Sequence, residues 1–283
     1  MRTVVFGRPT ELLALRRLGS RGRVSVVLCE DRRTRRQVVA KQTRLKTCES
    51  SGDDALQELR VARLLHRVGG HPHIVSFYSG VVLDDWLCLT MEHCAGGDLY
   101  SFLEAQPEQR LRNERHALML WRQVVSAVAF LHSVGIAHRD LSLENVLLDE
   151  RHQHAKLCDF GLSVSVGKRD TRDGGIVGES RQAVLHGARG RAVHSVRRVP
   201  SGRLVAGRHA LIMVSGSPLV ELAAPSDRAF QVLQRGVQPS AVLQHWGLHG
   251  SLSTETLELL DTLLQCDPDQ RPSSAAHVLA RMS

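Results

Sequence analysis

The residues whose types and spacing could do chemistry are concentrated between positions 138 and 161 of this 283-residue chain. The stretch HRDLSLENVLLD contains Asp140 and, five residues later, Asn145, and the stretch CDFG contains Asp159. These residue types at this spacing indicate phosphoryl transfer.

The first part of the chain has the pattern of strands. Short apolar and polar runs over 12–47 predict a β-hairpin around the polar turn DRRTRR, and the stretch 73–93 predicts two strands joined at Asp84 and Asp85. Between them, residues 54–67 place apolar side chains at helical spacing, and the sequence GGHP ends that helix. We therefore expect a small β-rich lobe that contains one helix.

The later part of the chain is mostly helical in pattern. Its longest helix is expected over 115–133, where apolar residues recur at helical spacing before Gly135. Strands first and helices later favour the α+β class, with a small N-lobe at 12–92 packed on a larger α-helical C-lobe at 93–283. We expect the whole chain, residues 1–283, to be one domain of this two-lobed kind.

Six motifs follow one another along the chain: LGSRGRVSVV at 18–27, VVAK at 38–41, LTMEHCAGGDL at 89–99, HRDLSLEN, CDFG, and CDPDQRP at 266–272. In this order and spacing they make the chain similar to the catalytic domain of eukaryotic serine/threonine protein kinases, although each motif alone would be weak. The resemblance runs from about residue 12 to 161 and resumes near Ile212. It implies a two-lobed fold, Mg²⁺ and ATP as cofactors, and γ-phosphoryl transfer to a protein hydroxyl.

The stretch LGSRGRVSVV resembles the glycine-rich loop of these kinases, in which backbone N–H groups approach phosphates because glycine has no Cβ. The resemblance gives nucleotide contacts to Leu18, Gly19, Gly22 and Val26. The family pattern has three glycines, whereas this stretch has two. Counting back from the VVAK lysine favours Val26 as the residue over the base, and counting glycines favours Val24.

A lysine on a buried strand needs a partner, because an unpaired buried charge is costly. The resemblance pairs Lys41, at the end of VVAK, with Glu58 in the expected helix, and has the lysine hold the α- and β-phosphates. The alternative is that both residues are solvated charges. Both residues belong to the implied catalytic set, together with Asp140 and Asn145.

The stretch LTMEHCAGGDL resembles the connector whose backbone hydrogen-bonds adenine. By this resemblance Met91 lies at the back of the nucleotide pocket, and Glu92 and Cys94 present backbone groups to the base. Asp98 is then expected to reach the ribose.

The same resemblance assigns roles at the chemical centre. Asp140 orients the substrate hydroxyl and accepts its proton, while Asn145 and Asp159 hold Mg²⁺. His138 is a packing residue rather than a base. One apolar column through both lobes is expected from the stacking of Ala62, Phe77, His138 and Phe160.

Ser142 departs from the family pattern, since serine/threonine kinases place a lysine there to neutralise charge on the transferred group. Loss of one such stabiliser costs roughly 3–4 kcal/mol, which slows phosphoryl transfer without abolishing it. The Glu-Asn ending of SLEN favours the serine/threonine class. The alternative is a catalytically impaired pseudokinase, or a nucleotide-binding interaction module.

Residues 170–209 lack the family pattern, and we expect them to be atypical and poorly ordered. Three explanations compete: a divergent insertion, a disordered regulatory loop, and translation in a shifted reading frame. The sequence VLHGARG (184–190) has codons that, read one base later, encode Tyr-Tyr-Met-Ala-Pro-Glu, which contains the missing family motif. Without that glutamate, Arg271 of CDPDQRP would lack its buried partner.

The net charge of +8 does not indicate a nucleic-acid binder. Ten basic and three acidic residues between Lys168 and Arg208 account for +7 of it, whereas a nucleic-acid binder spreads its basic residues over a folded face. We expect a protein substrate, no nucleic acid and no membrane, and the sequence leaves the oligomeric state open.

The location is inferred from what the sequence lacks. It has no apolar run of membrane-spanning length and no apolar leader in MRTVVFGRPT, and its six cysteines are scattered, which is typical of reduced thiols. A cytoplasmic or nuclear location is expected.

Overall fold

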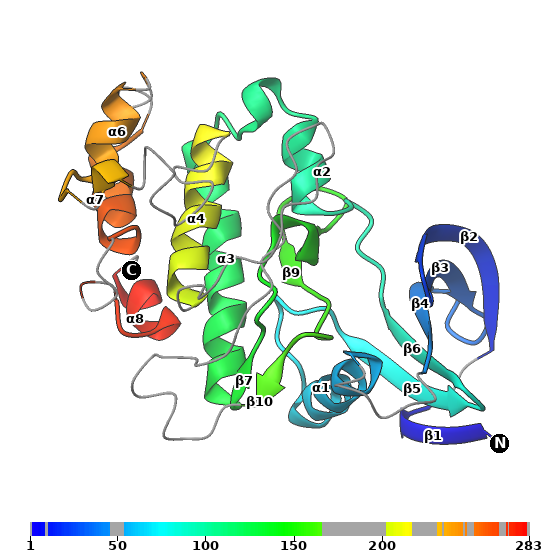
Figure 1. Cartoon of the computed structure of the whole chain (residues 1–283). Coiled ribbons are helices and arrows are strands. Elements are labelled where there is room, and N and C mark those ends of the chain that lie inside the picture. Colours follow the sequence, from blue (N-terminus) through cyan, green and yellow to red (C-terminus); the bar gives the residue numbers. More distant parts are fainter. Residues whose placement is uncertain are drawn as a thin grey trace. The chain divides into compact units, whose positions relative to one another are not determined.

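The computed structural model describes residues 2–8, 11–45, 54–165, 202–216, 231–233, 235–245, 247, 252–265, 270 and 272–281. It divides into two compact units, one made of Met1–Gly96 and Leu147–Val164 and the other of Gly97–Val146 and Ser165–Ser283. One unit is rich in strands and the other in helices (Figure 1), which confirms the predicted α+β class. The boundary lies at Gly96, and the segment 147–164 folds with the first unit rather than with the helices.

The first unit is built on one antiparallel sheet with the strand order β1-β5-β6-β4-β3-β2. Its strands are β1 (Arg2–Gly7), β2 (Leu12–Arg21), β3 (Val24–Asp31), β4 (Gln37–Arg44), β5 (Phe77–Leu83) and β6 (Trp86–Glu92). The predicted hairpin is β3–β4, and its turn is held by Asp31, whose carboxylate accepts from the N–H groups of Arg33 and Thr34. The predicted second pair is β5–β6, which turns at Asp84 with a positive φ of 51°.

The sequence predicted no strand before residue 12, yet β1 lies at one edge of this sheet. It pairs with β5 from Arg2 opposite Leu83 to Gly7 opposite Ser79. Gly7 has a φ of 70°, and a Cβ there would lie 2.0 Å from the carbonyl oxygen of Tyr78, so glycine is needed for this close approach.

Helix α1 (Asp54–Val68) packs against β5 in the first unit (Figure 1). Its buried side chains recur at helical spacing, as in Ala55, Leu59, Ala62 and Leu65, which form the apolar face of an amphipathic helix. A second small sheet joins β8 (Val146–Leu148) to β9 (Ala155–Leu157) and carries the chain toward CDFG.

The second unit is centred on α3 (Glu114–Ser133), the predicted long helix, which Asn113 caps by accepting from the N–H of His116. Buried side chains such as Trp121 and Leu131 line it, and α4 and α8 pack against it. The other elements of this part are α2 (Leu99–Glu104), η1 (Pro107–Gln109), β7 (Ile136–Ala137), η2 (Leu143–Asn145), β10 (Val164–Ser165), α4 (Gly202–Ser215), α6 (Pro239–His245), α7 (Thr254–Leu263) and α8 (Ala275–Ala280).

Part of the atypical segment falls within the structure. Its last residues begin α4, whose buried side chains Leu211–Val214 belong to the region where the resemblance resumes. Residues 170–201 and Arg271 lie outside the described residues, so their predicted disorder and missing ion pair stay predictions. The cysteines Cys29, Cys88, Cys94 and Cys158 are free thiols. Within the described ranges, no helix is both long and apolar enough to cross a membrane.

The carboxylate of Glu114 links the first turn of α3 to the first turn of α7 in the second unit. Glu114 accepts from the N–H of Ser253 at 3.1 Å and from its hydroxyl at 2.7 Å, and Ser253 in turn caps α7. Burial raises the pKa of Glu114, but the hydrogen bonds from Thr256 and Ser253 outweigh it, so the pKa is lowered overall.

Glu114→Gln is expected to lower the free energy of unfolding by about 1 kcal/mol at pH 7. Because the folded pKa is depressed, the wild-type advantage should be full above about pH 4.3, the unfolded pKa, and should be lost as the pH falls through the folded pKa. Urea unfolding of both proteins at pH 7 and at pH 3.5 measures the difference. Glu258→Gln, an exposed change on α7, is the control, and equal losses in the two variants would contradict the assignment.

Candidate active site

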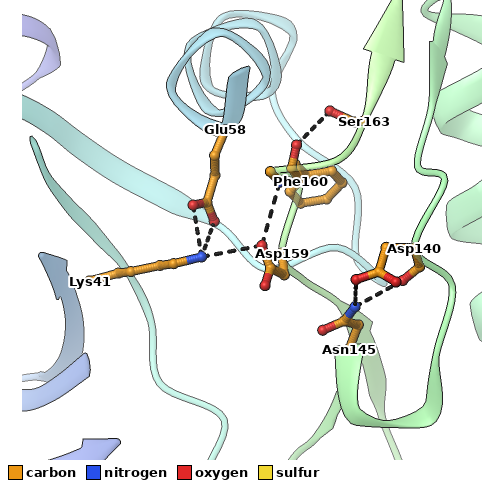
Figure 2. Close-up of polar contacts among 8 residues, drawn as sticks. Lys41, Glu58, Asp140, Asn145, Asp159, Phe160 and Ser163 are labelled. Carbon is orange, nitrogen blue, oxygen red and sulfur yellow. Dashed lines mark hydrogen bonds and ion pairs between the residues drawn. The ribbon is translucent and has the colours of Figure 1, made fainter. Parts of the chain in front are cut away.

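The first unit brings three of the predicted residues together around one ammonium group. Lys41 on β4 lies 2.9 Å and 2.8 Å from the two carboxylate oxygens of Glu58 on α1. It also lies 3.2 Å from Oδ1 of Asp159, which follows β9 (Figure 2). The side chains of Lys41 and Glu58 are 16% and 4% exposed, whereas that of Asp159 is 46% exposed. The predicted ion pair between strand and helix is therefore present. Of the two carboxylates around the lysine, that of Asp159 is the solvent-exposed one.

The electrostatics of this cluster keep the lysine charged. Burial disfavours the ammonium, but the charges of Glu58 and Asp159 outweigh it and raise the pKa of Lys41 above its ordinary value. A buried charge with two hydrogen-bonded carboxylates is satisfied, so the lysine remains a cation throughout the physiological range. Such a cation can bind an anion that approaches from the Asp159 side.

The backbone around Asp159 is held in a turn. Asp159 has a φ of 61°, an uncommon conformation that aspartate tolerates better than most residues. The ring of Phe160 is fully buried and lies edge-on to Phe77 at 6.0 Å. Its carbonyl accepts from the hydroxyl of Ser163 at 2.6 Å, a buried contact that the sequence did not suggest. Ala62, Phe77 and Phe160, three members of the expected column, are thus buried in the first unit.

The glycine-containing hairpin lies directly beside this cluster in the sheet. Gly19 on β2 is opposite Val26 on β3, and Val26 is opposite Lys41 on β4. Directly opposed residues of an antiparallel sheet point to the same face, so Val26 shares a face with the lysine. Val24 lies on the same face but opposite Thr43 on β4, so the register favours Val26 as the residue directly beside the lysine.

The other residues predicted in this hairpin are open to an approaching ligand. A Cβ placed at Gly19 would meet no heavy atom of the described residues within 4 Å, and Gly22 turns the chain with a φ of 56°. Leu18 is 42% exposed.

The connector leaves β6 at Glu92 after the buried Met91. The carboxylate of Glu92 forms an ion pair with Lys156 at 3.1 Å and accepts from the N–H of Ser76. Within the described part of the chain, the backbone N–H and C=O of Cys94 take no hydrogen bond. Burial raises the pKa of the Cys94 thiol to about 12, so this cysteine of the connector is un-ionised. Its backbone is available for the predicted contact with a base.

The second unit brings Asp140 and Asn145 together. The side-chain amide of Asn145 donates to the carbonyl of Asp140 at 2.8 Å and to its carboxylate at 3.0 Å (Figure 2). The buried His138 accepts from the N–H of Asp140 through Nδ1, which fits its predicted packing role. Arg139 has a φ of 67°, so this loop also contains an uncommon backbone conformation of the kind found at functional sites.

Asp98 was predicted to reach the ribose, and the structure gives its carboxylate a further partner. It caps α2, accepting from the N–H and the hydroxyl of Ser101, both at 2.8 Å. Each carboxylate oxygen of Asp98 accepts one of these two hydrogen bonds, so an oxygen that contacted a ribose would do so in addition to capping α2.

The sequence model of the protein kinase domain family matches residues 13–181, more than half of the chain. The chain belongs to this family. Its resemblance to serine/threonine kinases is confirmed by relatives such as the NUAK family SNF1-like kinase 1 of Homo sapiens, which is 43% identical over 93 residues, or 33% of this chain and 14% of that protein. The family match ends at 181, inside the atypical segment.

Two other relatives match over most of this kinase domain. The serine/threonine-protein kinase ULK3 of Xenopus laevis is 29% identical over 273 residues, covering 94% of this chain and 54% of that protein. The maternal embryonic leucine zipper kinase of Danio rerio is 29% identical over 259 residues, covering 90% of this chain and 35% of that protein. The chain therefore spans between about a seventh and about a half of the length of these relatives.

In this kinase, Ser142 stands at the start of η2 and its hydroxyl makes no capping hydrogen bond. The next residue, Leu143, is 2% exposed and anchors the turn that carries Asn145. The loop thus keeps its shape without the lysine that the family pattern places at 142. Serine at this position lacks the positive charge of the lysine. Asp140 and Asn145 are held in place by the hydrogen bonds between them.

Proposed function

We propose that this protein kinase domain binds Mg²⁺-ATP and transfers the γ-phosphoryl group to a serine or threonine hydroxyl of a protein substrate. The observation that carries the proposal is the buried Lys41, held by Glu58 and open toward Asp159. The ammonium of Lys41 has one buried partner, Glu58, and one exposed partner, Asp159. Such a cation is suited to hold phosphates beside a carboxylate that could bind a metal ion.

The residues present fit a magnesium ion that arrives with a nucleotide. Among the described residues there is no group of three or more His, Cys, Asp and Glu side chains that could hold a metal by themselves. Mg²⁺ needs no such cage, since it takes one or two protein oxygens together with phosphates and water. The proposed donors are the carboxylate of Asp159 and Oδ1 of Asn145, which accepts no hydrogen bond from the described residues. Bound there, Mg²⁺ would neutralise phosphate charge.

Lys41 is proposed to hold the α- and β-phosphates. Its contacts with Glu58 are shorter than its contact with Asp159, so phosphate oxygens would take the N–H that now faces Asp159. Glu58 would keep the ammonium in place. Gly19, Gly22 and Val26 would face the nucleotide from the hairpin, and the connector backbone at Cys94 would face the base.

Asp140 is proposed to orient the substrate hydroxyl and to accept its proton. The hydroxyl oxygen bonds to the γ-phosphorus as the bond from that phosphorus to the bridging oxygen breaks, and ADP leaves. Asn145 helps to fix the Asp140 carboxylate, because its side-chain amide donates to Oδ2 of Asp140 at 3.0 Å.

Calorimetric titration of the full chain with ATP tests the binding half of this proposal. We expect saturable binding that requires Mg²⁺ and is lost in Asp159→Asn. Binding that is equally tight with a metal chelator present would contradict the assigned role of Asp159.

A second candidate function, nucleotide binding without turnover, is favoured by Ser142. The absent lysine would have stabilised charge on the transferred phosphoryl group, so its loss lowers the expected rate.

Ser142→Lys is expected to raise kcat for phosphoryl transfer by about 100-fold to 1,000-fold, which corresponds to about 3–4 kcal/mol of transition-state stabilisation. Steady-state transfer of labelled phosphate measures the change. Ser142→Gln is the matched control, because it lengthens the side chain without adding charge. If the lysine variant and the glutamine variant have the same kcat, the electrostatic account of position 142 is wrong.

A further inference from the structure

The edge strand β1 contributes one buried side chain to the first unit. The register with β5 shifts between Val4 and Phe6, so Val5 is an extra residue in a β-bulge. Across the bulge the exposure changes: Val4 is 45% exposed, whereas Phe6 is 8% exposed. Of the β1 side chains whose burial the structure describes, Phe6 alone is buried.

The ring of Phe6 lies over a gap in the sheet that only glycine provides. A Cβ at Gly80, directly opposite on β5, would lie 2.4 Å from Cε1 of Phe6 and 3.0 Å from Cδ1 of Leu59. The ring from β1 and the leucine from α1 therefore meet above Gly80. Leu59 follows Glu58 in the sequence, so this contact is next to the ion-pairing residue.

Phe6 also packs against α1 at His66, about two turns beyond Leu59. Its ring centroid lies 5.2 Å from that of His66, at a tilt of 44°. Nδ1 of His66 is 3.0 Å from the carbonyl oxygen of Phe77, and the Phe77 ring packs on Phe160. Phe6 thus shares the space above Gly80 with Leu59 and packs against His66 on the same helix. Through His66 and Phe77 this packing is connected to Phe160, the residue after Asp159.

A helix of fifteen residues has little stability of its own, so packing on its apolar face sets its position. The distance of 2.8 Å between Lys41 and Glu58 requires α1 to stay at one place against the sheet. A contact made by a strand outside the recognised kinase sequence is therefore a means of fixing this ion pair.

We propose that β1 is a clamp for α1, in which Phe6 is a positioning residue that holds Glu58 against Lys41. The proposal rests on the proposed function only in so far as the ion pair serves phosphoryl transfer. Loss of the clamp would loosen α1 while the rest of the sheet remains paired.

The first test is amide hydrogen exchange of the full chain, followed by mass spectrometry. In Phe6→Ala, we expect the amides of α1 to exchange at least about tenfold faster than in the wild type, while those of the β3–β4 hairpin are unchanged. Val4→Ala, an exposed change on the same strand, should leave α1 unchanged. Thermal melting confirms that each variant is folded, and Phe6→Leu replaces Phe6→Ala if the latter is not.

A double-mutant cycle with Gly80 separates this contact from general loosening. Gly80→Ala alone should also speed exchange in α1, because its Cβ would strike the Phe6 ring. In the Phe6→Ala background the same change should add less than it does alone, because the ring is gone. Independent, additive effects would overturn the proposed contact.

The second test reads the ion pair itself and needs no catalysis. The side chain of Lys41 is 16% exposed, and its Nζ lies 2.9 Å and 2.8 Å from the two carboxylate oxygens of Glu58, so loosening of this pair would open the amine to a reagent in solution. At pH 8, Lys41 in folded Phe6→Ala should react with an amine-acylating reagent severalfold faster than in the wild type or in Val4→Ala.

The proposal requires both results. An α1 that exchanges at the wild-type rate in folded Phe6→Ala overturns the clamp, and an unchanged Lys41 reaction rate overturns the positioning role. Both readouts work in a chain without transfer activity, so failure of the proposed function is distinguished from failure of the clamp. Where transfer is measurable, Phe6→Ala should lower kcat more than it raises KM for ATP.

Discussion

Asp140→Asn is expected to lower kcat for phosphoryl transfer by about 10²–10⁴-fold, the usual contribution of a positioned general base. The amide has the shape of the carboxylate but cannot accept the proton of the substrate hydroxyl. Asn145 can still donate to its oxygen, so the loop geometry should survive. Steady-state transfer of labelled phosphate measures kcat, and thermal melting measures folding.

The same variant should bind Mg²⁺-ATP as tightly as the wild type, because Asp140 belongs to neither the lysine cluster nor the proposed metal ligands. Glu150→Gln, an exposed change in the following turn, is the control and should leave kcat unchanged. Wild-type kcat in a folded Asp140→Asn would refute the role of Asp140 as base.

Glu58→Ala is expected to lower the free energy of unfolding by about 3–5 kcal/mol, because removing one partner leaves Lys41 buried with only the more exposed Asp159. Glu58→Gln should cost less, since its amide oxygen can still accept from the ammonium. Urea unfolding at pH 7 measures both. A loss below about 1 kcal/mol, as for an exposed ion pair, would contradict the burial argument.

The stability difference between wild type and Glu58→Ala should depend on pH through the titration of Lys41. Glu58 and Asp159 raise the pKa of Lys41 above its unfolded value of about 10.4, so their stabilisation is complete below that pH and is lost as the pH rises through the folded pKa. The difference between wild type and Glu58→Ala should therefore be constant from about pH 6 to pH 9. A difference that disappears within this range would show that Lys41 is not the group that Glu58 stabilises.

Most elements could be predicted from the sequence because their signals are local. The helix predicted over 115–133 is α3 in the structure, and Asn113 caps it. The polar turn predicted after β3 joins β3 to β4 in a hairpin. Strand β1 could not be predicted in this way. A short apolar run becomes an edge strand only when a partner such as β5, about seventy residues later, offers its backbone and leaves Gly80 to accommodate a ring.

The site was predictable in part for a related reason. Lys41 and Glu58 are 17 residues apart and lie on a strand and on a helix, so no local pattern pairs them, and before the structure only the family resemblance did so. Where the sequence left Val24 and Val26 as alternatives, strand register favoured Val26. The ion pair from Glu92 to Lys156 joins segments 64 residues apart and has no local signal, so sequence reasoning missed it.

The most direct test of the central claim follows labelled γ-phosphate from ATP to a protein substrate in the presence of the full chain. A basic protein rich in serine and threonine serves as a general acceptor. The account predicts transfer to serine or threonine that requires Mg²⁺, is lost in Lys41→Met and falls steeply in Asp140→Asn. Transfer by Lys41→Met and by Asp140→Asn at the wild-type rate would contradict it. So would the absence of transfer by both the wild type and Ser142→Lys when each is folded and has Mg²⁺-ATP bound.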